Sequence, residues 1–333
     1  MLDNKICKVC NNSVDNKTYI AKEMMFGTQD EFEYLKCNNC FCLQLIDLPL
    51  DLSRYYPINY YSLKKPSQEN VFLKNLRLYL RYKRSKYLLS KKGFLGKVIF
   101  HFSDDYFERN SDWDWFRKTG THLNSNILDI GCGTGKLLRH MDNQGFTKLS
   151  GLDPYIEEDI VFGIRNKHII YKKFPEQHNG DFDLVMLHHS FEHMQDPIFI
   201  LKQINRLLKI NHFALLRVPL CDSYAWEKYG VNWVQLDAPR HLFLHTIKSI
   251  QILSNLTGFE ISDIVYDSTS FQFIGSEMYL RNISLEHSKK IQINKIFSEK
   301  VIDTFKRDAE KLNLKNEGDQ ACFYLKKIKS IKI

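Results

Sequence analysis

A glycine-rich segment at residues 126–136 constrains the fold of this chain more than any other feature. Its sequence, NILDIGCGTGK, is an apolar run typical of a buried strand, followed by three glycines spaced two residues apart and then by a helical pattern. Gly131, Gly133 and Gly135 allow the backbone to turn tightly and to approach a ligand without interference from a Cβ atom. The segment therefore predicts a nucleotide-binding turn between a strand and a helix.

The spacing of the glycines separates two classes of cofactor. A dinucleotide-binding fingerprint has its third glycine three residues after the second, and Lys136 occupies that position here. The sequence DIGCGTG, which begins at Asp129, instead resembles motif I of the class I S-adenosylmethionine (SAM) dependent methyltransferases. In that family the loop lies under the amino acid part of the cofactor. The resemblance therefore implies SAM rather than NAD.

The residues after the loop complete a strand–helix–strand unit. A helical pattern ends at Gly145, and residues 148–153 have the pattern of a second strand with Asp153 at its carboxyl end. An acidic side chain at this place in a doubly wound fold accepts hydrogen bonds from both ribose hydroxyls. We predict Asp153 as the ribose ligand, the alternative being a surface acid in a turn before Pro154.

A polar cluster follows the next long strand. Further strands and one intervening helix are expected at residues 168–172, 181–187, 198–208 and 213–218. The strand ending at Leu187 is followed at once by HHSFEH, at residues 188–193. Ligands of open α/β sheets lie beyond the carboxyl ends of the strands, so this cluster is expected to face the methyl group of SAM. The sequence FDLVMLHHSFEHMQDP also resembles the post-strand motif of the same methyltransferase class.

The pattern as a whole predicts an α/β fold, a Rossmann-like domain with the seven-stranded sheet of class I methyltransferases. The last two, antiparallel strands are expected at 259–265 and 320–325, with a helical insertion over 280–316 between them. The predicted domains are a zinc ribbon over 1–48, an aromatic and basic helical linker region over 49–122, and the methyltransferase domain over 123–333.

The two motifs and the resemblance together imply a cofactor site made of the glycine-rich loop, the ribose-binding turn and the polar cluster. The predicted cofactor contacts are Asp129, Gly131, Cys132, Gly133, Gly135, Asp153, Pro154, Phe174, His188 and Glu192.

Methyl transfer from SAM is an in-line displacement on a good electrophile, so positioning of the acceptor dominates and the acceptor proton must be removed. Neutral imidazole has a pKa suited to that task. His189, after the fourth strand, and His241, in a polar loop after the fifth, are the candidate general bases; the alternative for each is a structural role. Arg240 is expected to hold a phosphate or carboxylate, or to pair with Asp237.

Two C-x-x-C pairs near the start of the chain predict a metal site. Cys7 and Cys10 precede a strand-like stretch, and Cys37 and Cys40 follow it. Four thiolates give Zn²⁺ its tetrahedral shell, and in a segment too small for its own core the metal supplies folding energy. The alternatives are two disulfides, disfavoured in a reducing compartment, or four buried thiols, disfavoured by the paired spacing. We predict a structural zinc ribbon.

Basic charge is concentrated in residues 70–103, which contain nine Lys or Arg and no acid, against a net charge of +8 for the whole chain. Four apolar residues of this segment fall on one helical stripe: Leu73, Leu76, Leu80 and Tyr87. The stripe indicates a helix packed on the catalytic domain with a solvated basic face. The alternatives are peripheral contact with an anionic membrane and attraction of a polyphosphate substrate.

A wider resemblance concerns the acceptor. The cysteine pairs, the stretch YYPINYYS at 55–62, the methyltransferase core and the segment WVQLDAPRHLFL at 233–244 together resemble the methyltransferases encoded in bacterial polysaccharide biosynthesis clusters. This resemblance implies methyl transfer to a nucleotide-linked or lipid-linked sugar, with no stable nucleic acid partner. An RNA methyltransferase that grips phosphates through the ribbon and the basic segment, and a non-catalytic SAM-binding protein, are the alternatives.

The expected location is the cytoplasm, and peripheral contact with the inner face of the membrane through residues 70–103 is the alternative. The chain has no apolar run of eighteen residues, and its first residues lack the apolar segment of a signal peptide.

Overall fold

The structure, a computed structural model, describes residues 6–56, 72–102, 112–163, 165–289, 291 and 293–332, and it divides into two compact units. Unit 1 comprises Met1–Pro57, His189–Leu201 and Leu216–Phe323, and unit 2 comprises Ile58–His188, Lys202–Leu215 and Tyr324–Ile333. The chain therefore passes between the units several times. Two strands, β9 (Leu208–Pro219) and β12 (Gln320–Lys327), contain residues of both.

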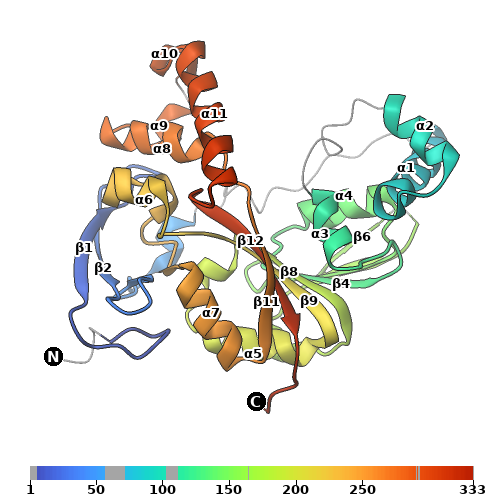
Figure 1. The fold of residues 1–333 in the computed structure, drawn as a ribbon, viewed down its shortest axis with the longest axis horizontal. Helices are drawn as coiled ribbons and strands as arrows, with labels where there is room; N and C mark the ends of the chain where they lie inside the picture. Colours follow the sequence, from blue (N-terminus) through green and yellow to red (C-terminus); the bar gives the residue numbers. More distant parts are fainter. Residues whose placement is uncertain are drawn as a thin grey trace. The chain divides into compact units, whose positions relative to one another are not determined.

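Unit 2 is built on a largely parallel sheet. Its central strands are β8 (Phe182–His188), β4 (Asn126–Ile130), β5 (Lys148–Leu152) and β7 (His168–Tyr171), adjacent in that order and parallel (Figure 1). Residues 184–187 of β8 are all buried, as expected for a parallel strand that is covered on both faces. The four predicted strands of this region are confirmed.

One strand of the sheet was not expected from the sequence. Strand β6 (Ile160–Phe162) pairs antiparallel with β7 at the edge, which gives the order β12-β9-β8-β4-β5-β7-β6 in unit 2. In unit 1, β11 (Phe259–Tyr266) is the neighbour of β12. A three-residue strand is too short to show a periodic pattern, so the prediction of seven strands was one too few.

The helices of unit 2 are α1 (Phe72–Ser90), α2 (Phe94–Phe102), α3 (Asp112–Lys118) and α4 (Lys136–Gln144). Helix α3 contributes to the core, because Trp113 and Phe116 both pack against Phe146, which follows α4. Helix α5 (Pro197–Leu207) begins in unit 1 and ends in unit 2.

The buried face of α1 differs from the predicted stripe. Leu78 and Leu88 are buried, whereas Leu76 is 63% exposed, so its assignment to the packed face was wrong; the side chain of Leu73 lies outside the described residues. Arg84 is also buried, and its guanidinium donates a hydrogen bond to Gln144 Oε1 at 3.0 Å. Arg84 therefore does not belong to the solvated basic face. Because the charged residue Arg84 lies on the packed face of α1, a search for apolar periodicity could not identify that face.

Unit 1 contains a separate antiparallel sheet. Its strands are β1 (Lys17–Lys22), β2 (Glu31–Lys36), β3 (Leu43–Leu45) and β10 (Phe243–Leu244), adjacent in that order. Figure 1 labels β1 and β2. The cysteine-rich ribbon thus takes its fourth strand from a segment two hundred residues later in the chain. The addition of β10 extends this small sheet by one strand.

The other helices of unit 1 are α6 (Tyr224–Tyr229), α7 (Ile247–Leu256), α8 (Phe271–Leu280), α9 (Leu285–Ser288), α10 (Ile293–Ile296) and α11 (Glu299–Leu314). The last three lie in the range predicted as a helical insertion. Phe305 of α11 stacks on Phe273 of α8, with ring centroids 5.3 Å apart. No helix of the described ranges has the length and apolar character needed to span a membrane.

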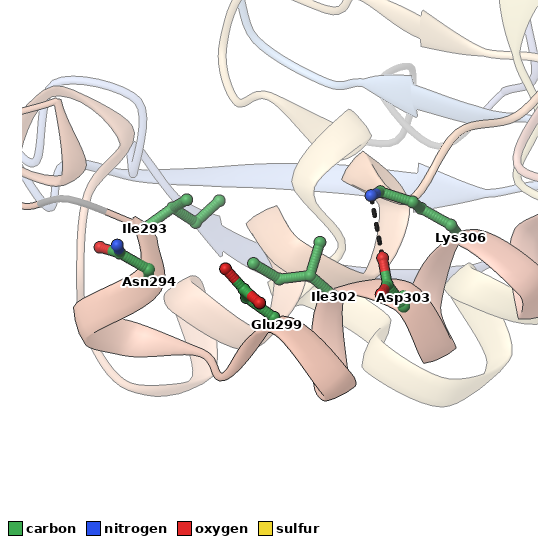
Figure 2. A pocket seen from close by; sticks show the side chains of 6 residues that line it. All are labelled: Ile293, Asn294, Glu299, Ile302, Asp303 and Lys306. Atoms are coloured by element: carbon green, nitrogen blue, oxygen red, sulfur yellow. Dashed lines mark hydrogen bonds and ion pairs between the residues drawn. The ribbon is translucent and has the colours of Figure 1, made fainter.

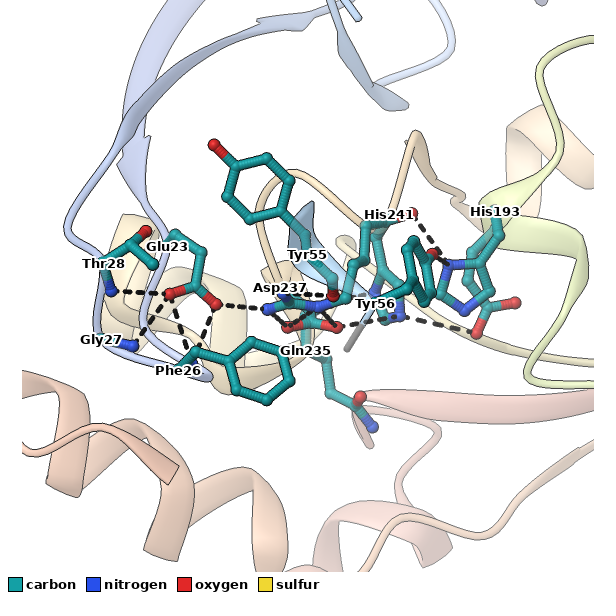
Figure 3. A network of polar contacts seen from close by, with 12 residues as sticks. Glu23, Phe26, Gly27, Thr28, Tyr55, Tyr56, His193, Gln235, Asp237 and His241 are labelled. Carbon is teal, nitrogen blue, oxygen red and sulfur yellow. Dashed lines mark hydrogen bonds and ion pairs between the residues drawn. The ribbon is translucent and has the colours of Figure 1, made fainter. Parts of the chain in front are cut away.

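A fully buried arginine connects the ribbon to the loop at 235–241. The Arg240 guanidinium donates to Glu23 Oε1 at 2.9 Å, to both oxygens of Asp237, and to the Tyr55 carbonyl oxygen at 3.4 Å (Figure 3). Glu23 also accepts hydrogen bonds from the backbone N–H groups of residues 26–28. Of the two expected roles for Arg240, the pairing with Asp237 is confirmed, because all three guanidinium nitrogens are engaged within the protein.

Removal of this guanidinium is expected to destabilise the protein strongly. The substitution Arg240→Ala leaves two buried carboxylates without their counter-charge, which costs about 3–5 kcal/mol in the free energy of unfolding. Arg281→Ala, which removes a surface pair between Arg281 and Glu277 at 3.9 Å, is the matched control and is expected to cost about 1 kcal/mol or less. Urea unfolding of both variants measures the difference, and equal midpoints would contradict the network's structural role.

Candidate active site

The loop between β4 and α4 has the geometry of a cofactor-binding turn. Gly131, Gly133 and Gly135 all have left-handed backbone conformations, with φ of 74°, 55° and 77°. A Cβ atom on Gly135 would lie 2.3 Å from Ile170 Cδ1, so a larger residue would also displace that side chain, but the left-handed backbone is the stronger reason for glycine. The predicted strand–turn–helix is confirmed as a local structure.

Asp153 is held against this loop. At the end of β5, its Oδ2 accepts a hydrogen bond from the Gly133 N–H at 2.8 Å, and its Oδ1 accepts one from the Tyr155 N–H at 2.9 Å. Each carboxylate oxygen can accept more than one hydrogen bond, so both retain capacity for a ribose hydroxyl. Asp153 is buried, with 8% of its surface exposed, so protein atoms alone already fix its position.

The predicted cofactor contacts fall in two places. Nine of them belong to unit 2, where Asp129, Asp153 and His188 lie at or just after the carboxyl ends of parallel strands, as ligand-binding residues do in such sheets. Pro154 follows Asp153 and is half-buried, and Phe174 lies after β7 with 44% of its surface exposed. The tenth, Glu192, belongs to unit 1. These assignments stay predictions.

Asp129 is a buried acid at the start of the loop. Burial, together with the nearby charge of Asp153, raises the pKa of Asp129 to about 8. At neutral pH much of this carboxyl group is therefore protonated before a ligand binds. A cationic ligand such as SAM would favour the ionised form.

Trp115 was not identified from the sequence. Its ring lies over the imidazole of His188, with centroids 4.4 Å apart and an interplanar angle of 34°, and it is 7% exposed. Trp115 comes from α3, inside the range predicted as a linker. The tryptophans of the DWDWF sequence were the available signal, because large aromatic residues seldom occur in a solvated linker.

The candidate base His189 is held between two charged groups. Arg217 donates a hydrogen bond to His189 Nε2 at 2.7 Å, which places the imidazole proton on Nδ1, 3.5 Å from Glu192 Oε1. The residue has a left-handed backbone with φ of 52°, which is uncommon for a non-glycine residue. In this arrangement the Nε2 lone pair is engaged, which favours the structural alternative for His189.

The second candidate base, His241, is buried and has a fixed tautomer. Its Nδ1 donates a hydrogen bond to the Gln235 carbonyl oxygen at 2.6 Å, so Nε2 carries the lone pair. Nε2 lies 3.9 Å from Glu192 Oε1 and 3.9 Å from Asp237 Oδ2. Burial, followed by the charge of His193, lowers the pKa of His241 to about 4. The ring is therefore neutral at pH 7 and a weak base.

Glu192 is a fully buried carboxylate in the short helix η6 (Phe191–His193). Burial acts to raise the pKa of Glu192, but the contact with His189 and the imidazoles of His193 and His241 outweigh it and lower the value to about 2. No described residue makes a geometrically complete hydrogen bond to either oxygen. His193 was not among the predicted site residues, yet its Nδ1 donates to the Arg240 carbonyl oxygen at 2.8 Å (Figure 3).

The four cysteines of the ribbon converge. Their sulfur atoms all lie within 4.8 Å of one another, and the pairs Cys7–Cys40 and Cys10–Cys37 are 3.5 Å apart. Four sulfurs about 2.3 Å from a zinc ion would be separated by about 3.8 Å. All eight cysteines of the chain are described and none forms a disulfide. The residues therefore fit a tetrahedral Zn²⁺ site.

A surface depression on α10 and α11 does not have the features of an active site (Figure 2). It is lined by Ile293, Asn294, Glu299, Ile302, Asp303 and Lys306. Lys306 already pairs with Asp303 at 3.0 Å, and the lining includes no cysteine or histidine. The chemistry-bearing residues lie elsewhere in the chain.

Comparison with known proteins agrees with the geometry of the loop. A family model described as a methyltransferase domain matches residues 90–264. The chain belongs to this family. It is therefore a SAM-dependent methyltransferase, and the α/β fold and the SAM cofactor predicted from motif I are confirmed.

Relatives of this methyltransferase include the ubiquinone biosynthesis O-methyltransferase of Sodalis glossinidius, which is 28% identical over 151 residues, 41% of this chain. The chain spans only 59% of that protein's length. The ubiquinone biosynthesis O-methyltransferase of Pseudomonas aeruginosa PAO1 is 25% identical over 171 residues, 46% of this chain and 72% of the relative.

Among solved structures, the cyclopropane synthase MmaA2 of Mycobacterium tuberculosis is similar with a TM-score of 0.42 and 17% identity, covering 74% of this chain and 97% of that one. A sarcosine dimethylglycine methyltransferase from Galdieria sulphuraria is similar with a TM-score of 0.43 and 13% identity. The match covers 66% of this chain and 85% of that one.

Asp153 is expected to contribute to SAM affinity. Asp153→Asn keeps the size of the side chain but removes the charge that strengthens hydrogen bonds to ribose, so the dissociation constant for SAM should rise about tenfold or more. Asp159→Asn, which alters an exposed acid a few residues later that accepts a hydrogen bond from the Lys172 N–H, should leave the affinity unchanged. Calorimetric titration with SAM measures both, and an unchanged constant in Asp153→Asn would remove the ribose role.

SAM binding is also expected to depend on pH through Asp129. Because its pKa is about 8 in the free protein and the cationic cofactor favours the carboxylate, binding should release a proton. Affinity should then rise as the pH increases from about 6 to 8 and level off above that. Titration in two buffers of different ionisation enthalpy counts the protons released, and Asp129→Asn should release fewer. Equal proton release by both proteins would show that Asp129 is not coupled to the cofactor.

Proposed function

We propose that this methyltransferase transfers the methyl group of SAM to a hydroxyl of a sugar, nucleotide-linked or lipid-linked, in a bacterial surface polysaccharide pathway. The sequence resemblance carried by the ribbon cysteines and by the segment at 233–244 supports the sugar class. The relatives from Sodalis glossinidius and Pseudomonas aeruginosa are O-methyltransferases, which supports oxygen as the methylated atom.

The polar cluster of Glu192, His193 and His241 is the observation that carries this proposal. These side chains lie in unit 1 together with Tyr56, whose hydroxyl is 3.2 Å from His193 Nδ1. An apolar acceptor placed against such groups would leave them without hydrogen-bond partners, at a cost of about 1–3 kcal/mol for each group. A polyhydroxylated acceptor would instead supply donors to them.

In this proposal each unit of the chain has a distinct task. The glycine-rich loop and Asp153 of unit 2 bind and orient SAM, whose sulfonium supplies the electrophilic methyl group. The polar cluster of unit 1 orients the acceptor hydroxyl. Positioning of this kind accounts for most of the rate of a displacement whose leaving group is already activated.

Zinc is proposed as a structural part of unit 1, held by Cys7, Cys10, Cys37 and Cys40. Gln44 positions the first pair without any ion, because its side chain accepts a hydrogen bond from the Lys8 N–H at 2.8 Å and donates one to the Ile6 carbonyl oxygen at 2.9 Å. The N–H groups of Asn39 and Cys40 point at Cys37 Sγ, at 3.3 and 3.4 Å. Backbone donors to a sulfur stabilise a thiolate ligand.

A lipid-linked acceptor is supported by the surface of α2. Phe94 is 84% exposed and Leu95 is 47% exposed, and the neighbouring Lys91, Lys92 and Lys97 are exposed too. Apolar side chains flanked by lysines are typical of helices that lie on anionic membranes. The same features are compatible with a solvated face, so the form of the acceptor is decided by experiment.

Substitution of a predicted zinc ligand should remove zinc, whereas substitution of a buried cysteine outside the four should not. Cys40→Ser is expected to lower the bound zinc from about one ion per chain to well below one and to reduce the melting temperature, because metal binding contributes to folding. Cys322→Ser, which alters a buried cysteine outside the four, should keep its zinc. Metal analysis of the purified proteins by mass spectrometry distinguishes them. Wild-type protein without zinc would end the proposal.

The function is tested by incubating the protein with methyl-labelled SAM and a host extract separated into sugar nucleotides, lipid-linked glycans, quinone precursors, RNA and protein. Label in either sugar pool is expected, and it also selects between the soluble and the membrane substrate. Label confined to quinone precursors would favour the chemistry named for the curated relatives. Label confined to RNA or protein would overturn the sugar acceptor. Asp153→Asn serves as the control with impaired cofactor binding.

A further inference from the structure

Three side chains of unit 1 converge as potential ligands of a cation. Glu192, His193 and His241 each offer one ligand atom, and these atoms all lie within 4.8 Å of one another. The carboxylate is fully buried, His241 is 6% exposed and His193 is half-buried. The cluster is separate from the four cysteines, which form their own group.

The imidazoles of His193 and His241 both carry a lone pair that can bind a metal ion. His193 donates its Nδ1 proton to the Arg240 carbonyl oxygen at 2.8 Å, and His241 donates its Nδ1 proton to the Gln235 carbonyl oxygen at 2.6 Å (Figure 3). The lone pair of each ring is therefore on Nε2. Histidines that bind metals almost always donate their other ring N–H to a backbone carbonyl or a carboxylate, which fixes the tautomer and the ring orientation in this way.

The buried carboxylate of Glu192 is not fully satisfied by hydrogen bonds. Glu192 has no complete hydrogen bond to either oxygen from the described residues, and the nearest ring nitrogens are His189 Nδ1 at 3.5 Å and His241 Nε2 at 3.9 Å. The second of these carries a lone pair rather than a proton. A buried carboxylate without complete hydrogen bonds is stabilised by a further positive charge beside it. Arg240 does not supply it, because its three nitrogens are directed to Glu23, Asp237 and Tyr55.

We propose that Glu192, His193 and His241 bind one divalent transition-metal ion. Two imidazole nitrogens and one carboxylate favour Mn²⁺, Co²⁺ or Zn²⁺ over Mg²⁺ and Ca²⁺, which prefer oxygen ligands only. Three protein ligands leave coordination positions open, as in catalytic rather than structural metal sites. His189 and Asp237 lie next to the ligands and would orient them.

The proposed ion gives the cluster a chemical role that rests on the proposed function. A sugar hydroxyl bound at an open position has a lowered pKa and loses its proton to water. The oxygen lone pair then forms the new bond to the methyl carbon, the carbon–sulfur bond breaks, and its electron pair leaves with sulfur as neutral S-adenosylhomocysteine. Neither His189 nor His241 then has to serve as the general base, which agrees with the engaged lone pair of the first and the buried position of the second.

The site is tested by titrating Mn²⁺ into the zinc-loaded full chain and measuring free Mn²⁺ by electron paramagnetic resonance. Mn²⁺ prefers nitrogen and oxygen ligands, so it does not compete for the four thiolates. The wild-type protein is expected to bind one Mn²⁺ per chain. Glu192→Gln, which keeps the shape of the side chain, should weaken binding about tenfold or more. Glu286→Gln alters the same Glu-His dipeptide where it is solvent-exposed on α9, and it should bind like the wild type.

Folding is checked in the same samples. All three proteins should retain about one zinc per chain, and Mn²⁺ should raise the melting temperature of the wild type and of Glu286→Gln but not of Glu192→Gln. Absence of saturable Mn²⁺ binding by the folded wild type, or equal binding by Glu192→Gln, overturns the site. Because binding is measured without an acceptor, label outside the sugar pools would refute the proposed function alone. Sugar labelling by a protein that binds no Mn²⁺ would refute the site alone.

Discussion

The buried guanidinium of Arg240 is the interaction on which unit 1 depends. It joins Glu23 of the cysteine-rich ribbon to Asp237 of a loop more than two hundred residues later in the chain, at 2.9 and 3.0 Å. The same residue fixes His193 through its backbone carbonyl. Next to it, the His241 carbonyl oxygen accepts a hydrogen bond from the Tyr34 hydroxyl of β2 at 2.8 Å. The ion-pair network therefore attaches the ribbon to the loop at 235–241, whose backbone carbonyl oxygens accept hydrogen bonds from both histidines of the polar cluster.

The ribbon consequently has a structural role apart from the proposed metal site. Its sheet takes β10 as a fourth strand, and β10 directly follows the loop that contains Arg240 and His241. A zinc ion at the four cysteines would stabilise this sheet and, through it, the position of the loop. In unit 2 the predicted cofactor-binding residues are held by a local contact: the Gly133 N–H of the glycine-rich loop donates a hydrogen bond to Asp153 at 2.8 Å. Under the proposed function, the two tasks of a methyltransferase would be met by two different kinds of structure.

How well the sequence predicts each feature depends on how far apart along the chain its interacting residues lie. The turn at 131–135, the acid at 153 and the parallel strands depend on neighbouring residues and on local periodicity, so they could be predicted. The pair Arg240–Glu23 could not, because its partners are 217 residues apart and either charge alone resembles a surface residue. For the same reason, no local pattern reveals that Glu192, His193 and His241 converge or which tautomers they adopt.

The division of labour between the units is tested most directly by comparing SAM binding with methyl transfer in Glu192→Gln, using the acceptor pool labelled by the wild-type protein. If Glu192 belongs to the acceptor side, the dissociation constant for SAM should stay within about twofold of the wild type, while single-turnover transfer falls about tenfold or more. A loss of SAM affinity as large as the loss of transfer would contradict this account and would place Glu192 at the cofactor.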